Sequence, residues 1–146
     1  MASALDVAEH ILSVRGPMSA MKLQKLVYYC QAWSLVWFDR PMFDEPIEAW
    51  VNGPVVPELY KAHRGQFTVR TVNGDPASLD EDARATIDAV LAFYGEKNAQ
   101  WLSDLTHAEE PWKNAREGLS HDERSDQTIA LDSMAEYYSS IAPGGE

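Results

Sequence analysis

Cysteine is almost absent from this chain of 146 residues, since Cys30 is the only one. A single cysteine excludes an intrachain disulfide and a cysteine-based zinc site. A nucleophilic thiolate would need exposure and a neighbouring positive charge or base. Cys30 instead falls on the apolar stripe of a segment predicted to be a buried helix. We therefore expect a core cysteine, because free cysteine is among the most buried residue types.

Positive charge is also scarce, with 12 Lys and Arg against 23 Asp and Glu and a formal net charge of -11. A chain this acidic repels phosphate backbones at long range, so we expect no direct binding of nucleic acid. A basic protein partner would be attracted, and it would associate faster at low salt. The alternative is that the acidity only keeps the protein soluble.

Long apolar runs are missing as well. The first twelve residues contain no basic region followed by an apolar core, which excludes a signal peptide. The longest apolar-rich stretch, from Leu23 to Phe38, is interrupted by polar side chains, which excludes a membrane span. We expect a cytoplasmic domain that makes no contact with a membrane.

The residue constellations of enzymes do not occur either. No two of the four histidines lie four residues apart, and there is no glycine-rich phosphate loop or nucleophile elbow. His107 could join Glu109 and Glu110 at a metal only with further ligands, so its expected role is a hydrogen bond to a neighbouring backbone group. Glu45 and Glu48, like Glu109 and Glu110, are expected to be solvated. We expect no enzyme, no metal site and no cofactor.

Apolar residues make up 45% of the chain, with five Trp and six Tyr, which is ample for one core. We expect a single domain over residues 1–146, with residues 143–146 as a frayed tail. Among the tryptophans, Trp33 and Trp37 are expected in the core. Trp50 and Trp112 flank polar loops, so a surface groove there is an alternative.

Local signals predict mostly helices. Apolar spacing and caps favour a first helix stopped by Gly16, a second capped by Ser19, and a long one begun by a capping box of Ser78 and Glu81. The remaining expected elements are a strand over 47–51, a short helix over 57–63, a β-rich stretch over 67–72, a helix capped by Asn98, a helix restarted by Pro111, a loop over 120–127 and a last helix over 131–141. The predicted fold is mainly α, a compact helical bundle with a small β element inserted between the second and third long helices.

Three blocks of sequence carry a resemblance to a known family. They are MKLQKLVYYCQAW at 21–33, FDEPIEAWVNGPVVPELY at 43–60 and LTHAEEPWK at 105–113. Together and in this order they resemble the Panacea domain, the SocA-like antitoxin family, over about two-thirds of the chain. Any one block alone would be a weak signal.

The resemblance implies a mainly helical antitoxin domain that neutralises a cognate, co-encoded toxin by direct binding. Some members of the family are thought to block their toxin, and one acts as an adaptor that delivers its toxin to a protease. A proteolytic adaptor that contacts an unfoldase or ATP-dependent protease is therefore an alternative, as is a phage-associated regulatory protein. An enzyme that acts on the toxin or on its product, through His107 and nearby acidic residues, is a further alternative. The family has no established active site.

The resemblance also sorts the residues of the blocks. Gly53 and Pro54 are expected to shape a turn, and Thr106 and His107, just before Pro111, to tie two helices together. The full set expected to hold the fold is Leu23, Leu26, Trp33, Gly53, Pro54, Tyr60, Thr106, His107 and Pro111.

Another set is expected to contact a partner. Five polar residues lie off the apolar stripe of the second helix and form either a partner-facing or an internally bonded surface. The partner-binding set is Lys22, Gln24, Lys25, Tyr28, Gln31, Trp50 and Trp112. Because one fold must serve many toxins, we place specificity outside the three blocks, at 66–80 and 120–128.

Overall fold

The computed structural model describes residues 2–120 and 122–142, so the predicted fraying of residues 143–146 lies outside the described residues. The described part is mainly helical, which confirms the predicted fold class. The helices are α1 (Ala4–Arg15), α2 (Ala20–Phe38), α3 (Pro57–His63), α4 (Glu81–Tyr94), α5 (Ala99–Ala108), α6 (Glu110–Ala115) and α7 (Leu131–Ile141), with a 3-10 turn η1 (Pro76–Ser78). The strands are β1 (Met18–Ser19), β2 (Glu48–Trp50), β3 (Gly53–Val55) and β4 (Thr68–Val69).

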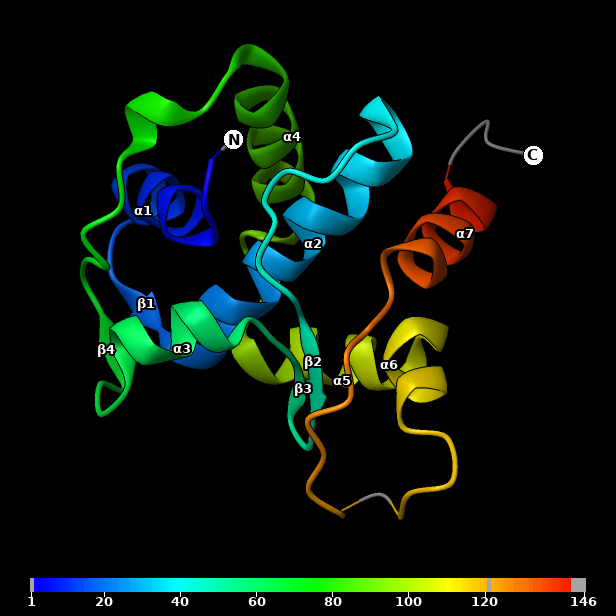
Figure 1. Cartoon of the computed structure of the whole chain (residues 1–146). Coiled ribbons are helices and arrows are strands. Elements are labelled where there is room, and N and C mark those ends of the chain that lie inside the picture. Colours follow the sequence, from blue (N-terminus) through cyan, green and yellow to red (C-terminus); the bar gives the residue numbers. More distant parts are fainter. Residues whose placement is uncertain (1, 121, 143–146) are drawn as a thin grey trace.

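Helix α2 lies at the centre of the molecule. The other long helices, α1, α4, α5 and α7, pack around it (Figure 1). Ser19 caps its first turn as predicted, with the side-chain oxygen accepting from the Lys22 amide at 3.2 Å. Every residue from Leu23 to Leu35 is buried. A helix enclosed on all sides must satisfy its polar side chains inside the protein.

Burial of α2 ends one turn before the helix does. Trp33 is buried, but Trp37 is 45% exposed and stacks on the Trp33 ring at 5.1 Å. The expectation that Trp37 belongs to the core is therefore wrong, because the last turn of α2 is only partly covered. Trp112 is buried, at 5% exposure, so the alternative of a surface position for this residue is not the one that the structure shows.

The β structure consists of two small antiparallel sheets. Strands β2 and β3 form a hairpin in which Glu48 faces Val55, at the inserted position that was predicted. Strand β4 does not join that hairpin, but pairs with β1, with Met18 opposite Val69. This pairing corrects the single inserted β element. The β-branched stretch 67–72 indicates a strand from its own residues. Its pairing partner, β1, lies before α2, and no nearby residue indicates that partner.

The start of α4 differs from the predicted capping box. Asp80 is the cap, with its Oδ1 accepting from the Ala83 amide at 2.8 Å. Ser78 ends the 3-10 turn, and its hydroxyl donates to Asp6 Oδ2 at 2.7 Å. Leu79 is extended between the two, so the helix begins later than the pattern of Ser78 and Glu81 indicates.

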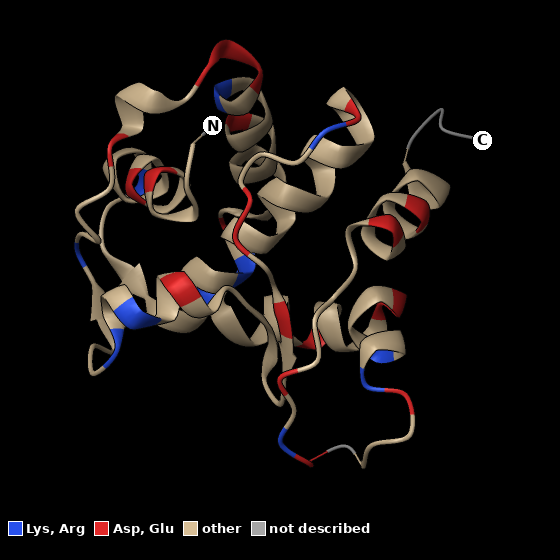
Figure 2. Cartoon of the chain, in the orientation of Figure 1, with Lys and Arg blue, Asp and Glu red and all other residues tan. Residues whose placement is uncertain are grey.

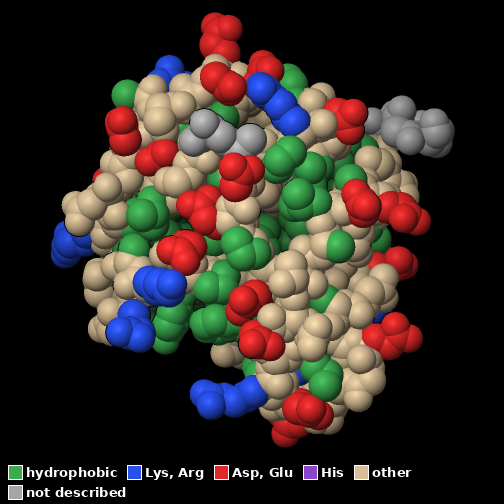
Figure 3. Space-filling model, viewed as in Figure 1, with side chains coloured by type: hydrophobic (Ala, Val, Ile, Leu, Met, Phe, Trp, Pro, Cys, Tyr) green, Lys and Arg blue, Asp and Glu red, His purple; other side chains and the backbone are tan. Residues whose placement is uncertain are grey.

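The charges are unevenly spread over this scaffold. Asp and Glu are prominent on α1, α4 and α7, whereas Lys and Arg gather around α3 and β4 (Figure 2). On the face shown in Figure 3, acidic side chains lie among patches of apolar ones. Within residues 2–120 and 122–142, no helix combines the length and the apolar character needed to cross a membrane.

Candidate functional site

Four consecutive carbonyl groups of the β2–β3 hairpin each accept a hydrogen bond from a side chain that follows much later in the sequence. The donors come from α5, from α6 and from the residue after α6. The pairs are Arg116 Nη1 to Ala49 O (3.0 Å), Trp112 Nε1 to Trp50 O (2.8 Å), His107 Nε2 to Val51 O (2.7 Å) and Ser103 Oγ to Asn52 O (2.9 Å). Two residues of the third sequence block, His107 and Trp112, and two residues that flank it, Ser103 and Arg116, thus hold the backbone of the second block.

His107 has the backbone-bonding role that was predicted for it. Its Nδ1 lies 2.6 Å from the Ser103 carbonyl oxygen, within α5, while Nε2 faces the hairpin. Thr106 donates to the same Ser103 carbonyl at 2.8 Å and so bonds within its own helix. The His107 ring also meets the Trp112 ring of α6 edge-on, with 4.2 Å between the ring centroids, so His107 links α5 to α6 as well as to the hairpin.

Two features of position 53 require a residue without a side chain. Its φ of +119° lies in the left-handed region that other residues resist. A Cβ there would also lie 2.6 Å from Lys25 Cε and 3.0 Å from Thr106 Oγ1. The turn expected at Gly53 is therefore confirmed, and the glycine brings the first, second and third sequence blocks together at one point.

Gln24 and Gln31 are both buried and bonded to the backbone. Gln24 Oε1 accepts from the Val56 amide at 2.9 Å, and Gln31 Oε1 accepts from the Met42 amide at 2.6 Å. Gln31 Nε2 in turn donates to the Phe43 carbonyl at 2.8 Å. Of the two expected alternatives, a partner-facing or an internally bonded surface, these two residues take the internal one.

The orientation of Gln24 defines the state of His63. Because Gln24 Oε1 faces an amide N–H, its Nε2 faces His63 Nε2, at 2.9 Å. The histidine nitrogen therefore accepts, and the imidazole is neutral. Burial lowers the pKa of His63, in agreement with a neutral ring.

Tyr28 belongs to a buried hydroxyl network and does not reach the surface. Its hydroxyl lies 3.0 Å from that of Tyr138, which donates to Glu109 Oε1 at 2.7 Å. Tyr29 donates to the same carboxylate oxygen at 2.7 Å. Burial raises the pKa of Glu109, while the two tyrosine hydrogen bonds lower it. The solvated role expected for Glu109 is wrong, because this carboxylate joins α2 to α7.

The other block residues lie where a structural role requires. Leu23, Leu26 and Trp33 are buried on α2, Pro54 is buried in β3, and Pro111 lies in the first turn of α6. Lys22 is half-buried and donates to the Gly95 carbonyl at 2.7 Å, at the end of α4. These positions agree with a set of residues that holds the fold.

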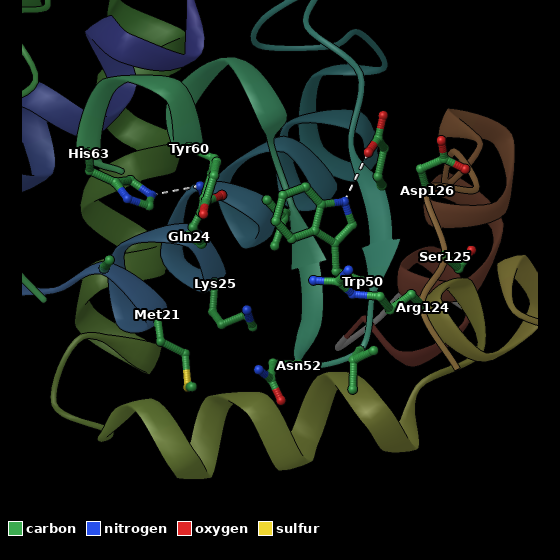
Figure 4. A pocket seen from close by; sticks show the side chains of 14 residues that line it. Met21, Gln24, Lys25, Trp50, Asn52, Tyr60, His63, Arg124, Ser125 and Asp126 are labelled. Atoms are coloured by element: carbon green, nitrogen blue, oxygen red, sulfur yellow. Dashed lines mark hydrogen bonds between the residues drawn. The ribbon is translucent and has the colours of Figure 1, made fainter. Parts of the chain in front are cut away.

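A cavity of about 730 Å³ opens beside the hairpin. Its lining comes from α2, the hairpin, α3 and the segment Arg124 to Asp126 (Figure 4). Three of the seven expected partner residues line it, namely Gln24, Lys25 and Trp50. The remaining four, Lys22, Tyr28, Gln31 and Trp112, are not part of its lining.

Lys25 lies at the bottom of this cavity. Its side chain points into the space between Met21, Trp50 and Asn52 (Figure 4). Lys25 is only 1% exposed, and its Nζ donates to the Pro54 carbonyl at 3.3 Å. No acidic group of the described residues forms an ion pair with it. Burial lowers the pKa of Lys25 to about 8.

The aromatic wall of the cavity is held by its neighbours. Trp50 Nε1 donates to Glu48 Oε1 at 2.9 Å, and Tyr60 meets the indole edge-on at 5.1 Å. Tyr60 also contacts His63, at 5.5 Å. Neither His63 nor Glu48 was predicted to belong to a binding site. The spacing of Tyr60 and His63 on one helix face was the available signal for His63.

Cysteine and metal chemistry find no support in the described residues. Cys30 is fully buried, as predicted, and burial raises the pKa of its thiol. Over residues 2–120 and 122–142, no group of three or more His, Cys, Asp or Glu side chains is arranged to hold a metal ion.

The chain is similar to known antitoxins over most of its length. The family model described as antitoxin SocA-like, Panacea domain, matches residues 23–113. Antitoxin SocA from Caulobacter vibrioides (strain NA1000 / CB15N) is 31% identical over 125 residues, which cover 76% of this chain and 62% of that protein. The chain thus spans less than two-thirds of the length of this relative. No solved structure matches significantly. The chain belongs to the SocA-like Panacea family.

Proposed function

From this family membership, we propose that the chain is an antitoxin that neutralises a co-encoded toxin by binding it directly, without catalysing a reaction. The observation that carries the proposal is the family match over residues 23–113, which includes nearly all of the three sequence blocks. The family description names antitoxins, and the similar protein from Caulobacter vibrioides is one.

The hydrogen bonds of the hairpin support a scaffold of this kind. Side chains within and beside the third block bind the carbonyl oxygens of residues 49–52, and carbonyl groups are the same whatever side chains the hairpin carries. The outer side chains can therefore change without loss of these bonds. A fold held in this way can present different surfaces to different toxins, while the block residues stay inside.

The cavity beside the hairpin is our proposed part of the binding surface. It brings together Lys25 and Trp50 of the expected partner residues, beside the internally bonded Gln24, and its rim includes Arg124, Ser125 and Asp126. These three residues belong to the segment 120–128, where specificity was expected. Concave sites lined by apolar and aromatic groups with a few polar ones are the usual place for recognition.

Co-expression with the product of the adjacent gene tests the proposal. The antitoxin role predicts that the chain restores growth and co-purifies with that product. Trp50→Ala should weaken both effects, because truncating an aromatic anchor in a binding surface is costly. Trp101→Ala is the matched control, since Trp101 is also partly exposed but does not line the cavity. Neither rescue nor co-purification by the natural chain would refute the proposal.

A proteolytic adaptor is a second way to neutralise a toxin, and the same assay separates the two. Direct blocking predicts equal rescue in cells with and without their ATP-dependent proteases. An adaptor predicts rescue, and loss of the toxin, only where the protease is present. We favour direct blocking, because binding to the toxin suffices for it and no second partner is required.

A further inference from the structure

The Lys25 ammonium group at the bottom of the cavity has more donors than acceptors around it. An ammonium group carries three N–H donors, and among the described residues Nζ has one acceptor, the Pro54 carbonyl at 3.3 Å. Burying a charge without a counter-charge is unfavourable, so buried ammonium groups are usually paired. The side chain lines the cavity and points into the space between Met21, Trp50 and Asn52 (Figure 4), and because it is only 1% exposed, an incoming acceptor must enter between these residues to reach it.

The walls of the cavity indicate the chemical character of the molecule that would carry such an acceptor. The walls contain the aromatic rings of Trp50 and Tyr60 and the thioether of Met21, and their aliphatic surface comes from Val51 and Val55. The Trp50 ring is oriented by its hydrogen bond to Glu48. Surfaces of this kind stabilise an apolar or aromatic body.

The charges around the cavity limit the charge of the ligand. Glu48 and Asp126 contribute carboxylates to its lining, and Arg124 contributes one cation. The chain as a whole carries a formal net charge of -11. A single buried ammonium group balances one negative charge, whereas a phosphate dianion usually requires several donors, such as an arginine fork or a nest of backbone amides. A singly charged carboxylate fits best.

We propose that the cavity over Lys25 is a binding site for a carboxylate carried on an apolar body, and that an acidic side chain or C-terminus of the bound partner protein supplies it. The choice of the partner as the source rests on the proposed antitoxin function. The chemistry of the site does not, because it follows from the ammonium group and the walls of this chain alone. A segment outside the sequence blocks, residues 124–126, borders the cavity and would meet the partner first.

Titration of the isolated chain with sodium benzoate tests the chemistry. Benzoate should shift the Trp50 indole N–H signal and the Lys25 Cε signal saturably, and it should leave the Trp101 indole signal unchanged. Benzoate should also raise the pKa of Lys25, because an adjacent anion favours the charged amine. Benzamide, which has the same shape but no charge, and phenyl phosphate should both bind more weakly.

Lys25→Met is the decisive variant, since methionine keeps an unbranched apolar stem. It should weaken benzoate binding by about tenfold or more, as expected when one partner of a buried charge pair is removed. Equal binding of benzoate and benzamide, or equal binding by the variant and the natural chain, would overturn the carboxylate site. Should the variant fail to fold, the Lys25 pKa in the natural chain decides, because an unchanged pKa at saturating benzoate also overturns it.

A second measurement tests the source of the carboxylate. If the partner supplies it, Lys25→Met weakens the complex with the adjacent gene product, and benzoate competes with that product. If benzoate binding is lost in the variant but the affinity for the partner is unchanged, the partner is not the source and the site takes a free acid. A natural chain that binds benzoate but never binds or neutralises the gene product would refute the proposed function and leave the carboxylate site standing.

Discussion

Replacing Lys25 by methionine should make the folded chain more stable at neutral pH. Lys25 is 1% exposed and its ammonium group has one hydrogen bond, to the Pro54 carbonyl. Keeping it charged in this environment is unfavourable, and burial lowers its pKa from 10.5 to about 8. Methionine removes the buried charge while its stem fills much of the same space.

The expected gain follows from two opposing effects. The lowered pKa of Lys25 corresponds to about 3 kcal/mol of penalty at neutral pH, at about 1.4 kcal/mol per pH unit. The substitution also takes a donor from the Pro54 carbonyl, which costs about 1 kcal/mol. The net expectation is an increase of about 2 kcal/mol in the free energy of unfolding at neutral pH.

The pH dependence has a definite sign. The folded pKa of Lys25 is below the unfolded value, so between about pH 8 and about pH 10 the unfolded chain binds more protons than the folded one. The stability of the natural chain should therefore rise with pH in this window, and that of Lys25→Met should stay nearly flat. At higher pH the buried tyrosines act in the opposite sense, because the folded state resists their ionisation: burial raises the pKa of Tyr94, for example, to about 12.

Urea unfolding of both proteins, followed by tryptophan fluorescence at several pH values, provides the assay. Lys61→Met is the matched control, because it removes the same charge from an exposed side chain that pairs with Glu58 at 3.1 Å. Its effect should stay within about 0.5 kcal/mol. If Lys25→Met is less stable than the natural chain at neutral pH, and the natural chain shows no rise above pH 8, the argument for a destabilising buried ammonium group is refuted.

Three further predictions concern the hairpin, the tyrosine network and the net charge. Gly53→Ala should destabilise the fold by about 3 kcal/mol, because position 53 has a positive φ and a Cβ there would lie 2.6 Å from the buried Lys25 side chain. Gly65→Ala is its control: position 65 also has a positive φ but faces open space, so the substitution should cost about 1 kcal/mol. Tyr138→Phe should cost about 2 kcal/mol because it leaves buried Glu109 with one donor fewer, and Tyr137→Phe should change little; urea midpoints measure all four variants. Association with a basic partner should slow as salt is added, because the chain carries a net charge of -11, and stopped-flow kinetics would show it.

The outcomes that contradict these predictions are specific. Equal effects of Gly53→Ala and Gly65→Ala would mean that the close approach of the lysine side chain is not what requires glycine. Equal effects of Tyr138→Phe and Tyr137→Phe would mean that the hydroxyl bond to Glu109 contributes little. A salt-independent association rate would assign the acidity to solubility alone.

Local signals explain why most helix boundaries were predictable. Gly16, Ser19 and Asn98 act within one turn of their own helix, so their roles depend on a few neighbouring residues. The capping box at Ser78 failed because Asp80, two residues later, is the cap of α4, while Ser78 ends the preceding 3-10 turn and donates to Asp6 on α1. Two capping residues so close together are both plausible from local sequence, and the path of the chain decides between them.

The polar residues on α2 show more clearly what the sequence pattern does not predict. Gln24, Lys25 and Gln31 interrupt an apolar helix, and the same spacing suits an exposed polar face. They are buried because extended chain around residues 42–43 and 54–56 lies against the helix and needs side-chain partners for its backbone. Which of them would be satisfied, and which would keep free donors in a cavity, depends on geometry that no spacing reveals.

The sequence by itself determined the mainly helical fold, the central position of α2, the core role of Cys30 and the family, because periodicity, caps and motif order are local or linear properties. Only the tertiary structure decided that β4 pairs with β1, that Glu109 lies inside, and that Lys25 faces an open cavity. The physical reason is the same in each case. Burial and long-range hydrogen bonding depend on which distant backbone and side-chain groups meet, and they meet only when the chain has folded.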